Sequence, residues 1–191
     1  MKKPSMPAGT QATVRVWDAV VRFTHWSVAA LVLWELEENS GGPLHRTLGY
    51  ATAGLVLLRL LWGFVGSPPA RFSAWLPSPS GALAYSRALL AGRAPRYLSH
   101  TPLGALMMVT MWTLILALAA TGWLSRLDAF WGEDWPVDLH AALADCLMVL
   151  VGVHVVAAIV MGRMHGENLV AAMIHGRKRA DDGSSRTTPR G

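Results

Sequence analysis

Four of the seven histidines lie in apolar segments of the sequence. If such a segment spans a membrane, an imidazole without a partner is energetically costly there. His140 and His154 are 14 positions apart within one such segment. On an α-helix this spacing puts both imidazoles within about 40° of one face and about 21 Å apart along the axis. One helix therefore presents an imidazole near each end of a membrane span.

The other two histidines match these in depth. His45 begins an earlier apolar segment at the same membrane boundary as His140. His25 lies about 12 Å inside the opposite boundary, as does His154. The depths predict two bis-histidine sites, His45 with His140 and His25 with His154.

The ligand types favour haem over other metal centres. Two imidazoles leave zinc or copper short of ligands, because the sequence indicates no carboxylate or thiolate at the same depth. A porphyrin supplies four nitrogens and needs only axial ligands. The single cysteine, Cys146, excludes an intrachain disulfide, a thiolate cluster and a covalent haem attachment motif. We therefore predict two noncovalent haem b groups whose iron ligands are His25, His154, His45 and His140.

Two arginines in the same segments have the charge to bind haem propionates. Arg22 precedes His25 by three residues, and Arg59 follows His45 by 14, so each lies near the face of its histidine. A buried arginine in lipid normally has an anionic partner. Snorkelling of the two guanidinium groups to lipid headgroups stays open as the alternative.

The other ionisable groups receive simpler interpretations. Asp145 is expected either to form a hydrogen bond within the bundle or to handle protons. The remaining histidines are expected to be solvated or in contact with lipid headgroups; they are His100, His165 and His175.

Composition indicates which elements position these residues. The chain has 191 residues, of which 52% are hydrophobic and 15% charged, against about 25% charged in a soluble domain. Apolar segments near the roughly 20 residues of a membrane span lie at about 17–36, 45–65, 98–124 and 139–162. We predict an all-α integral membrane four-helix bundle with two stacked b-type haems. Residues 14–179 form its domain, between a cytoplasmic tail at 1–13 and a disordered cytoplasmic tail at 180–191.

The distribution of charge predicts orientation. Of the 17 Lys and Arg residues, 13 lie in the N-terminal tail, the long middle loop and the C-terminal tail. The positive-inside rule then places both termini in the cytoplasm of a bacterial cell, with the protein multi-pass in the inner membrane. Because topology explains the net charge of +5, we predict no nucleic-acid binding. Segment 81–92 is expected to form an amphipathic interfacial helix.

Several segments share the pattern of a known family. They are VWD at 16–18, RFTHW at 22–26, HRTLGY at 45–50, RLLWGFVG at 59–66, ARF at 70–72, PRYLSHTP at 95–102 and HGENLV at 165–170. With these segments the chain resembles the bacterial cytochrome b561 and nickel–iron-hydrogenase b-type cytochrome family. The resemblance extends from about residue 14 to residue 179.

The resemblance implies a two-haem membrane cytochrome that exchanges electrons between the quinone pool and a redox partner, such as a c-type cytochrome or a dehydrogenase. It implies axial ligands from the first, second and fourth helices, and a quinone as a further ligand. An electron-transfer subunit is expected rather than a self-contained enzyme. One alternative is a superoxide:quinone or ferric oxidoreductase acting at a haem edge. Another is a haem-free membrane transport or metal-binding protein, which the unbroken, unrepeated helices do not favour.

Overall fold

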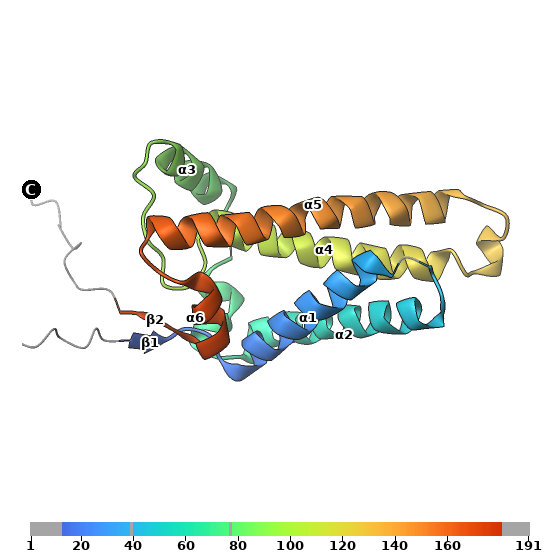
Figure 1. Cartoon of the computed structure of the whole chain (residues 1–191), viewed down its shortest axis with the longest axis horizontal. Coiled ribbons are helices and arrows are strands. Elements are labelled where there is room, and N and C mark those ends of the chain that lie inside the picture. The colour runs from blue at the N-terminus through green and yellow to red at the C-terminus, as the bar shows by residue number, and fades with distance from the viewer. Residues whose placement is uncertain (1–12, 39, 77, 181–191) are drawn as a thin grey trace, which may run out of the picture.

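The computed structural model describes residues 13–38, 40–76 and 78–180. Within these ranges, four helices are long and apolar enough to cross a membrane, and they make the chain a multi-pass membrane protein. The last three of them run along the long axis of the molecule, and the first crosses it obliquely (Figure 1). The tails predicted at 1–13 and 180–191 lie almost entirely outside the described residues. The four helices are α1 (Ala19–Glu37), α2 (Pro43–Val65), α4 (Pro102–Leu124) and α5 (Trp135–Met164).

The four helices pack in a chain of neighbours. α1 packs on α2, α2 on α4, and α4 on α5, whereas α1 and α5 are not among the closely packed pairs of the described residues. Each helix contributes one residue to a shared buried cluster of Val32, Val56, Ile115 and Leu147. The bundle thus has a common apolar centre and a looser seam between α1 and α5.

Prolines set where three of the spans begin. Pro43, Pro102 and Pro136 stand in the first turns of α2, α4 and α5, where a missing backbone N–H costs nothing. Consequently α4 begins at residue 102, about four residues later than predicted from the sequence. Helix α5 begins at residue 135, about four residues earlier than predicted. The extra turn at the start of α5 moves His140 from the edge of the predicted span to the second turn of the helix.

Asp18 fixes the start of α1. Its carboxylate accepts a hydrogen bond from the backbone N–H of Val21 at 2.9 Å, as a helix N-cap does. It also accepts bonds from Trp62 Nε1 at 2.9 Å and Ser67 Oγ at 2.5 Å. Burial raises the pKa of Asp18, but these hydrogen bonds together hold it below its ordinary value. The carboxylate therefore joins the start of α1 to the end of α2.

Most of the short elements gather at one end of the bundle (Figure 1). They include α3 (Pro79–Leu90), which packs on α4, and α6 (Leu169–His175), which packs on α5. Strand β1 (Thr13–Arg15) pairs antiparallel with β2 (Arg177–Arg179). The helix expected at 81–92 is thus present, two residues earlier at each end, because Ser78 caps it and Pro79 begins it.

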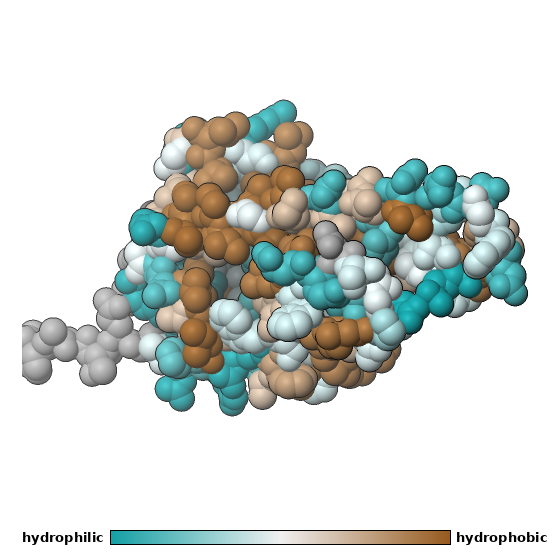
Figure 2. Space-filling model, turned by 45° about the vertical axis from the view of Figure 1, so that its right-hand side comes forward, coloured by the Kyte–Doolittle hydropathy of each residue, from teal (hydrophilic) through white to brown (hydrophobic). Residues whose placement is uncertain are grey.

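Large apolar side chains cover much of the outer surface of the bundle (Figure 2). Phe64 is 72% exposed and Val149 is 63% exposed. An exposed apolar surface of this extent is typical of helices whose neighbours are lipid tails.

Candidate haem sites

The four predicted ligand histidines meet in the two predicted pairs. His25 of α1 faces His154 of α5 with 6.3 Å between ring centroids. His45 of α2 faces His140 of α5 with 6.1 Å between centroids. Helix α5 thus contributes one imidazole to each pair, and the other members come from α1 and α2.

Both separations fit two axial ligands on one iron. A bond between a metal and a histidine nitrogen is about 2 Å, and a ring centroid lies about 1 Å behind that nitrogen, so two such rings have centroids about 6 Å apart. Within the described ranges, no group of three or more His, Cys, Asp or Glu residues could hold a metal ion. The ligand set therefore suits a group that brings its own equatorial nitrogens, as haem does.

A cavity adjoins the His45–His140 pair. Its empty space is about 670 Å³ including its open mouth, and its walls are mainly apolar side chains of α1, α2, α4 and α5. Two glycines, Gly49 and Gly122, stand in its wall. A Cβ on Gly122 would lie 3.4 Å from His140 Cε1, so a larger side chain there would crowd the ring. Gly122 was not recognised from the sequence, because its distance from His140 depends on how α4 packs against α5.

Protein groups fix the orientation of both rings in this pair. His45 Nδ1 lies 2.8 Å from the carbonyl oxygen of Glu38 and 3.1 Å from Glu35 Oε2. His140 Nδ1 lies 3.1 Å from the carbonyl oxygen of Leu118 and 3.0 Å from Thr121 Oγ1. With Nδ1 engaged, each ring keeps Nε2 for a metal, which is how metal-binding histidines are usually held.

The position of Glu35 corrects one expectation. The sequence indicated no carboxylate at the depth of the histidines, yet Glu35 contacts His45. The prediction was wrong because α1 ends only at Glu37 and α2 starts at Pro43, so the tight connection brings the last turn of α1 beside the first turn of α2.

The His25–His154 pair has less support. His25 Nδ1 is buried and has no hydrogen-bond partner among the described residues. His154 is exposed at the seam between α1 and α5. The exposed side of His154 therefore leaves room beside the pair for a bound group.

Both arginines that were predicted to bind haem propionates donate hydrogen bonds to backbone carbonyls. Arg22 Nη1 donates to the carbonyl of Ile174 near the end of α6 at 2.7 Å. Arg59 Nη2 donates to the carbonyl of Ala70 at 3.2 Å, and its guanidinium lies 5.3 Å from the ring centroid of Trp112. Arg59 is only 5% exposed, so its burial argues against snorkelling. Arg22 Nε and Arg59 Nη1 are buried without a partner among the described residues, which leaves each arginine an N–H for an anion.

His100 is half-buried between aromatic rings, whereas the sequence led us to expect a solvated side chain or one in contact with lipid headgroups. Its ring lies between Trp17 and Trp75, with centroid separations of 4.7 Å and 4.9 Å. Burial lowers the pKa of His100 to about 3, with further lowering by Arg59 and Lys178. The ring is therefore neutral at physiological pH. Its packing was not predictable, because it depends on a loop folding over the end of the bundle.

Three other residues complete the comparison with the sequence predictions. His175 is exposed as expected, and His165 is half-buried, with Nδ1 3.0 Å from the carbonyl oxygen of Met161. Asp145 is exposed on α5, which does not favour the expected hydrogen bond within the bundle.

Comparison with known proteins identifies the family of the chain. The family model described as prokaryotic cytochrome b561 matches residues 16–176. A probable Ni/Fe-hydrogenase B-type cytochrome subunit of Rhizobium leguminosarum bv. viciae is 24% identical, over 87% of this chain and 89% of the relative. A protein of the same description from Bradyrhizobium diazoefficiens is 27% identical, over 89% of this chain and 87% of the relative. No solved structure matches the chain. The chain belongs to the prokaryotic cytochrome b561 family and is thus a b-type cytochrome that carries electrons in a membrane.

Proposed function

We propose that the chain holds two b-type haems and passes electrons across the bacterial inner membrane between the quinone pool and a redox partner protein. His25 and His154 ligate one iron, and His45 and His140 ligate the other. The observation that carries this proposal is that α5 faces two other histidines at two levels, His154 with His25 and His140 with His45, with ring centroids 6.3 Å and 6.1 Å apart. Haem supplies one-electron chemistry by alternating between ferrous and ferric iron.

The residues of the chain determine what kind of chemistry is open to the bound group. Two histidines at each iron leave no axial position for oxygen or another substrate. The walls around His45 and His140 are mainly apolar and offer few hydrogen-bonding groups to a polar substrate. These features favour outer-sphere electron exchange, and they support an electron-transfer subunit over a self-contained enzyme.

The arginines have a supporting role in this proposal. Arg22 and Arg59 each keep one buried N–H group without a protein partner in the described ranges. Haem carries two propionates, whose charge would satisfy such groups. We assign both arginines to propionate binding.

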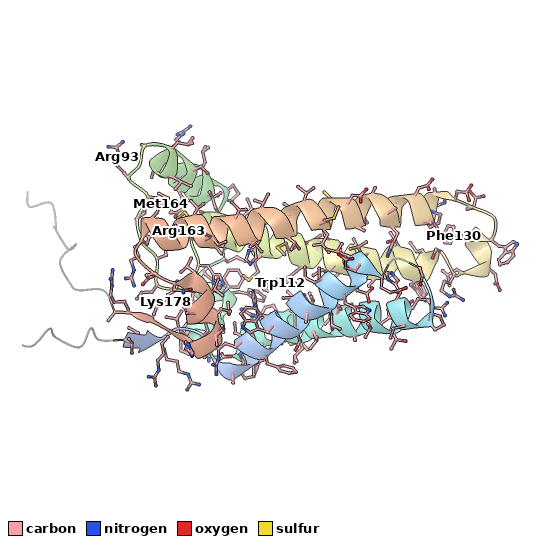
Figure 3. All side chains as sticks on the ribbon, viewed as in Figure 1. Arg93, Trp112, Phe130, Arg163, Met164 and Lys178 are labelled. Carbon is pink, nitrogen blue, oxygen red and sulfur yellow. The ribbon has the colours of Figure 1, made fainter. Side chains whose placement is uncertain are left out.

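The two ends of the bundle differ in charge, which supports the proposed orientation. Arg93, Arg163 and Lys178 lie at the end that carries α3 and α6, and Phe130 lies at the opposite end (Figure 3). The connection around Phe130 contains Asp128, Glu133 and Asp134. By the positive-inside rule the basic end, with both termini, faces the cytoplasm. The His45–His140 haem then lies nearer the outer surface.

The relatives support a complex with a partner. Both are described as probable cytochrome subunits of Ni/Fe hydrogenases. We propose that this chain likewise serves a dehydrogenase or a c-type cytochrome as its redox partner, with quinone at the other end of the electron path. Family membership argues against the haem-free transport alternative.

A haem count tests the proposal. The purified protein in detergent should show a b-type spectrum when reduced and two haems per chain in a pyridine haemochrome assay. Extraction with acid and acetone should remove both, because the link to the protein is noncovalent. The variant His175→Ala, which changes an exposed histidine, should keep both haems. A count of one or none in the unmodified protein would overturn the proposal.

A further inference from the structure

The two histidine pairs differ in the charge beside them. His45 Nδ1 lies 3.1 Å from Glu35 Oε2, and no lysine or arginine among the described residues lies within ion-pair distance of Glu35. His140 Nδ1 instead meets a carbonyl and a hydroxyl. His25 Nδ1 has no hydrogen-bond partner in the described part of the chain. One ligand of the four therefore has an anionic partner.

We infer that Glu35 is a positioning residue for the His45–His140 haem, and that its carboxylate gives this haem the lower reduction potential of the two. The inference rests on the proposed ligation. It adds which of the two haems has the lower reduction potential. Neither the ligand pairs nor membership of the family supplies this.

The physical cause is the effect of a carboxylate on a ligating imidazole. His45 Nδ1 forms its hydrogen bond with the carbonyl of Glu38, and the carboxylate of Glu35 lies beside the same ring nitrogen. A negative charge beside the ring makes its other nitrogen more basic. A more basic ligand favours ferric over ferrous iron, and hydrogen bonding to ligands is one of the levers that set the potential of a haem. A negative charge near the iron acts in the same direction, because the ferric state carries one more positive charge.

The environment of Glu35 preserves this effect. Its side chain is only 16% exposed, so water screens the carboxylate weakly. Its second oxygen, Oε1, is buried without a hydrogen-bond partner among the described residues. Arg46 lines the same cavity but forms no ion pair with Glu35 in the described ranges. No arginine or lysine among the described residues therefore neutralises this carboxylate, and His45 is the group within ion-pair distance of it.

Removing the charge should leave the ligand in place. His45 Nδ1 also lies 2.8 Å from the backbone carbonyl of Glu38, and no side-chain substitution removes that group. Glu35→Gln keeps the size of the side chain and loses its charge. The variant should therefore retain the haem, so that its potential can be measured.

The experiment is a redox titration of the purified, haem-loaded protein, followed by optical and low-temperature paramagnetic resonance spectra. At a fixed solution potential, Glu35→Gln should raise the ratio of reduced to oxidised His45–His140 haem at least tenfold, equivalent to about 59 mV for one electron. The His25–His154 component should not move. The matched control is Glu37→Gln, which removes the same charge from an exposed residue two positions away in α1. It should change the ratio less than twofold.

A second measurement does not depend on the Glu35 variant. The component that His45→Ala eliminates should be the lower-potential component of the unmodified protein. An unchanged potential in Glu35→Gln would overturn this inference and leave the proposed ligation intact. So would equal shifts in the Glu35 and Glu37 variants, or loss of the higher-potential component in His45→Ala. Retention of both components in His45→Ala would overturn the proposed ligation together with the inference.

Discussion

The rings of His25 and His154 face each other with centroids 6.3 Å apart, although their helices are not among the closely packed pairs of the described residues. Direct packing of α1 on α5 would remove the space between the rings. The seam therefore suits a bound group that contacts both helices, and the protein without haem should be less stable at this end. The pairing leads to the first prediction.

Substituting either member of a pair should abolish the same haem. His25→Ala and His154→Ala should each lose one redox component, and His45→Ala and His140→Ala should each lose the other, because each iron needs both of its imidazoles. Redox titration with low-temperature paramagnetic resonance measures the components. Loss of one shared component in the His25 and His45 variants would contradict the pairing.

Removing Arg59 should lower the potential of the His25–His154 haem. The guanidinium is a buried positive charge, and loss of a nearby positive charge favours the ferric state. At a fixed solution potential, Arg59→Leu should lower the ratio of reduced to oxidised haem several-fold. The matched control is Arg87→Leu, which removes an exposed positive charge from α3. Equal ratios in the Arg59 variant and the unmodified protein would exclude Arg59 from propionate binding.

The stability of the protein should fall on acidification in a way that depends on His100. Burial lowers the pKa of His100 to about 3 in the folded state, whereas an unfolded histidine has a pKa near 6.5. The unfolded chain therefore takes up a proton first as the pH falls. The contribution of His100 is fully present above about pH 6.5 and declines between pH 6.5 and pH 3.

This dependence can be measured by thermal unfolding in detergent at pH 7.5 and pH 5. His100→Phe keeps an aromatic ring between Trp17 and Trp75 but cannot be protonated. The difference in Tm between the two pH values should be smaller in this variant than in the unmodified protein. His175→Ala should leave the difference unchanged, because His175 is exposed. An equal difference in the His100 variant would show that the ring does not titrate in the expected way.

Reporter fusions should show that both ends of the domain face the cytoplasm. A fluorescent reporter that folds only in the cytoplasm should be active after Arg179, and a phosphatase that folds only in the periplasm should be active when inserted near Glu133. The expectation follows from the basic residues at one end of the bundle. The reverse pattern would exchange the inner and outer positions of the two haems without changing their ligands.

Helical periodicity explains what the sequence could predict. Spacings of 14 residues and matching depths place His140, His154 and their partners correctly, because a straight membrane helix has a nearly constant rise and turn per residue. The same regularity predicts four spans. The contact of Glu35 with His45 and the packing of His100 were missed, because both depend on the path of short connections. No periodic pattern describes that path.

The pairing of Val14 with Lys178 limits how the chain can be inserted into a membrane. Along the sequence, β1 precedes all four membrane-spanning helices and β2 follows them. The two strands can therefore meet only if the polypeptide crosses the bilayer an even number of times. A molecule with one helix left out of the membrane would hold its strands on opposite sides and could not form the ribbon. Pairing of β1 with β2 must therefore come after the last crossing, and it distinguishes a fully inserted molecule from a partly inserted one.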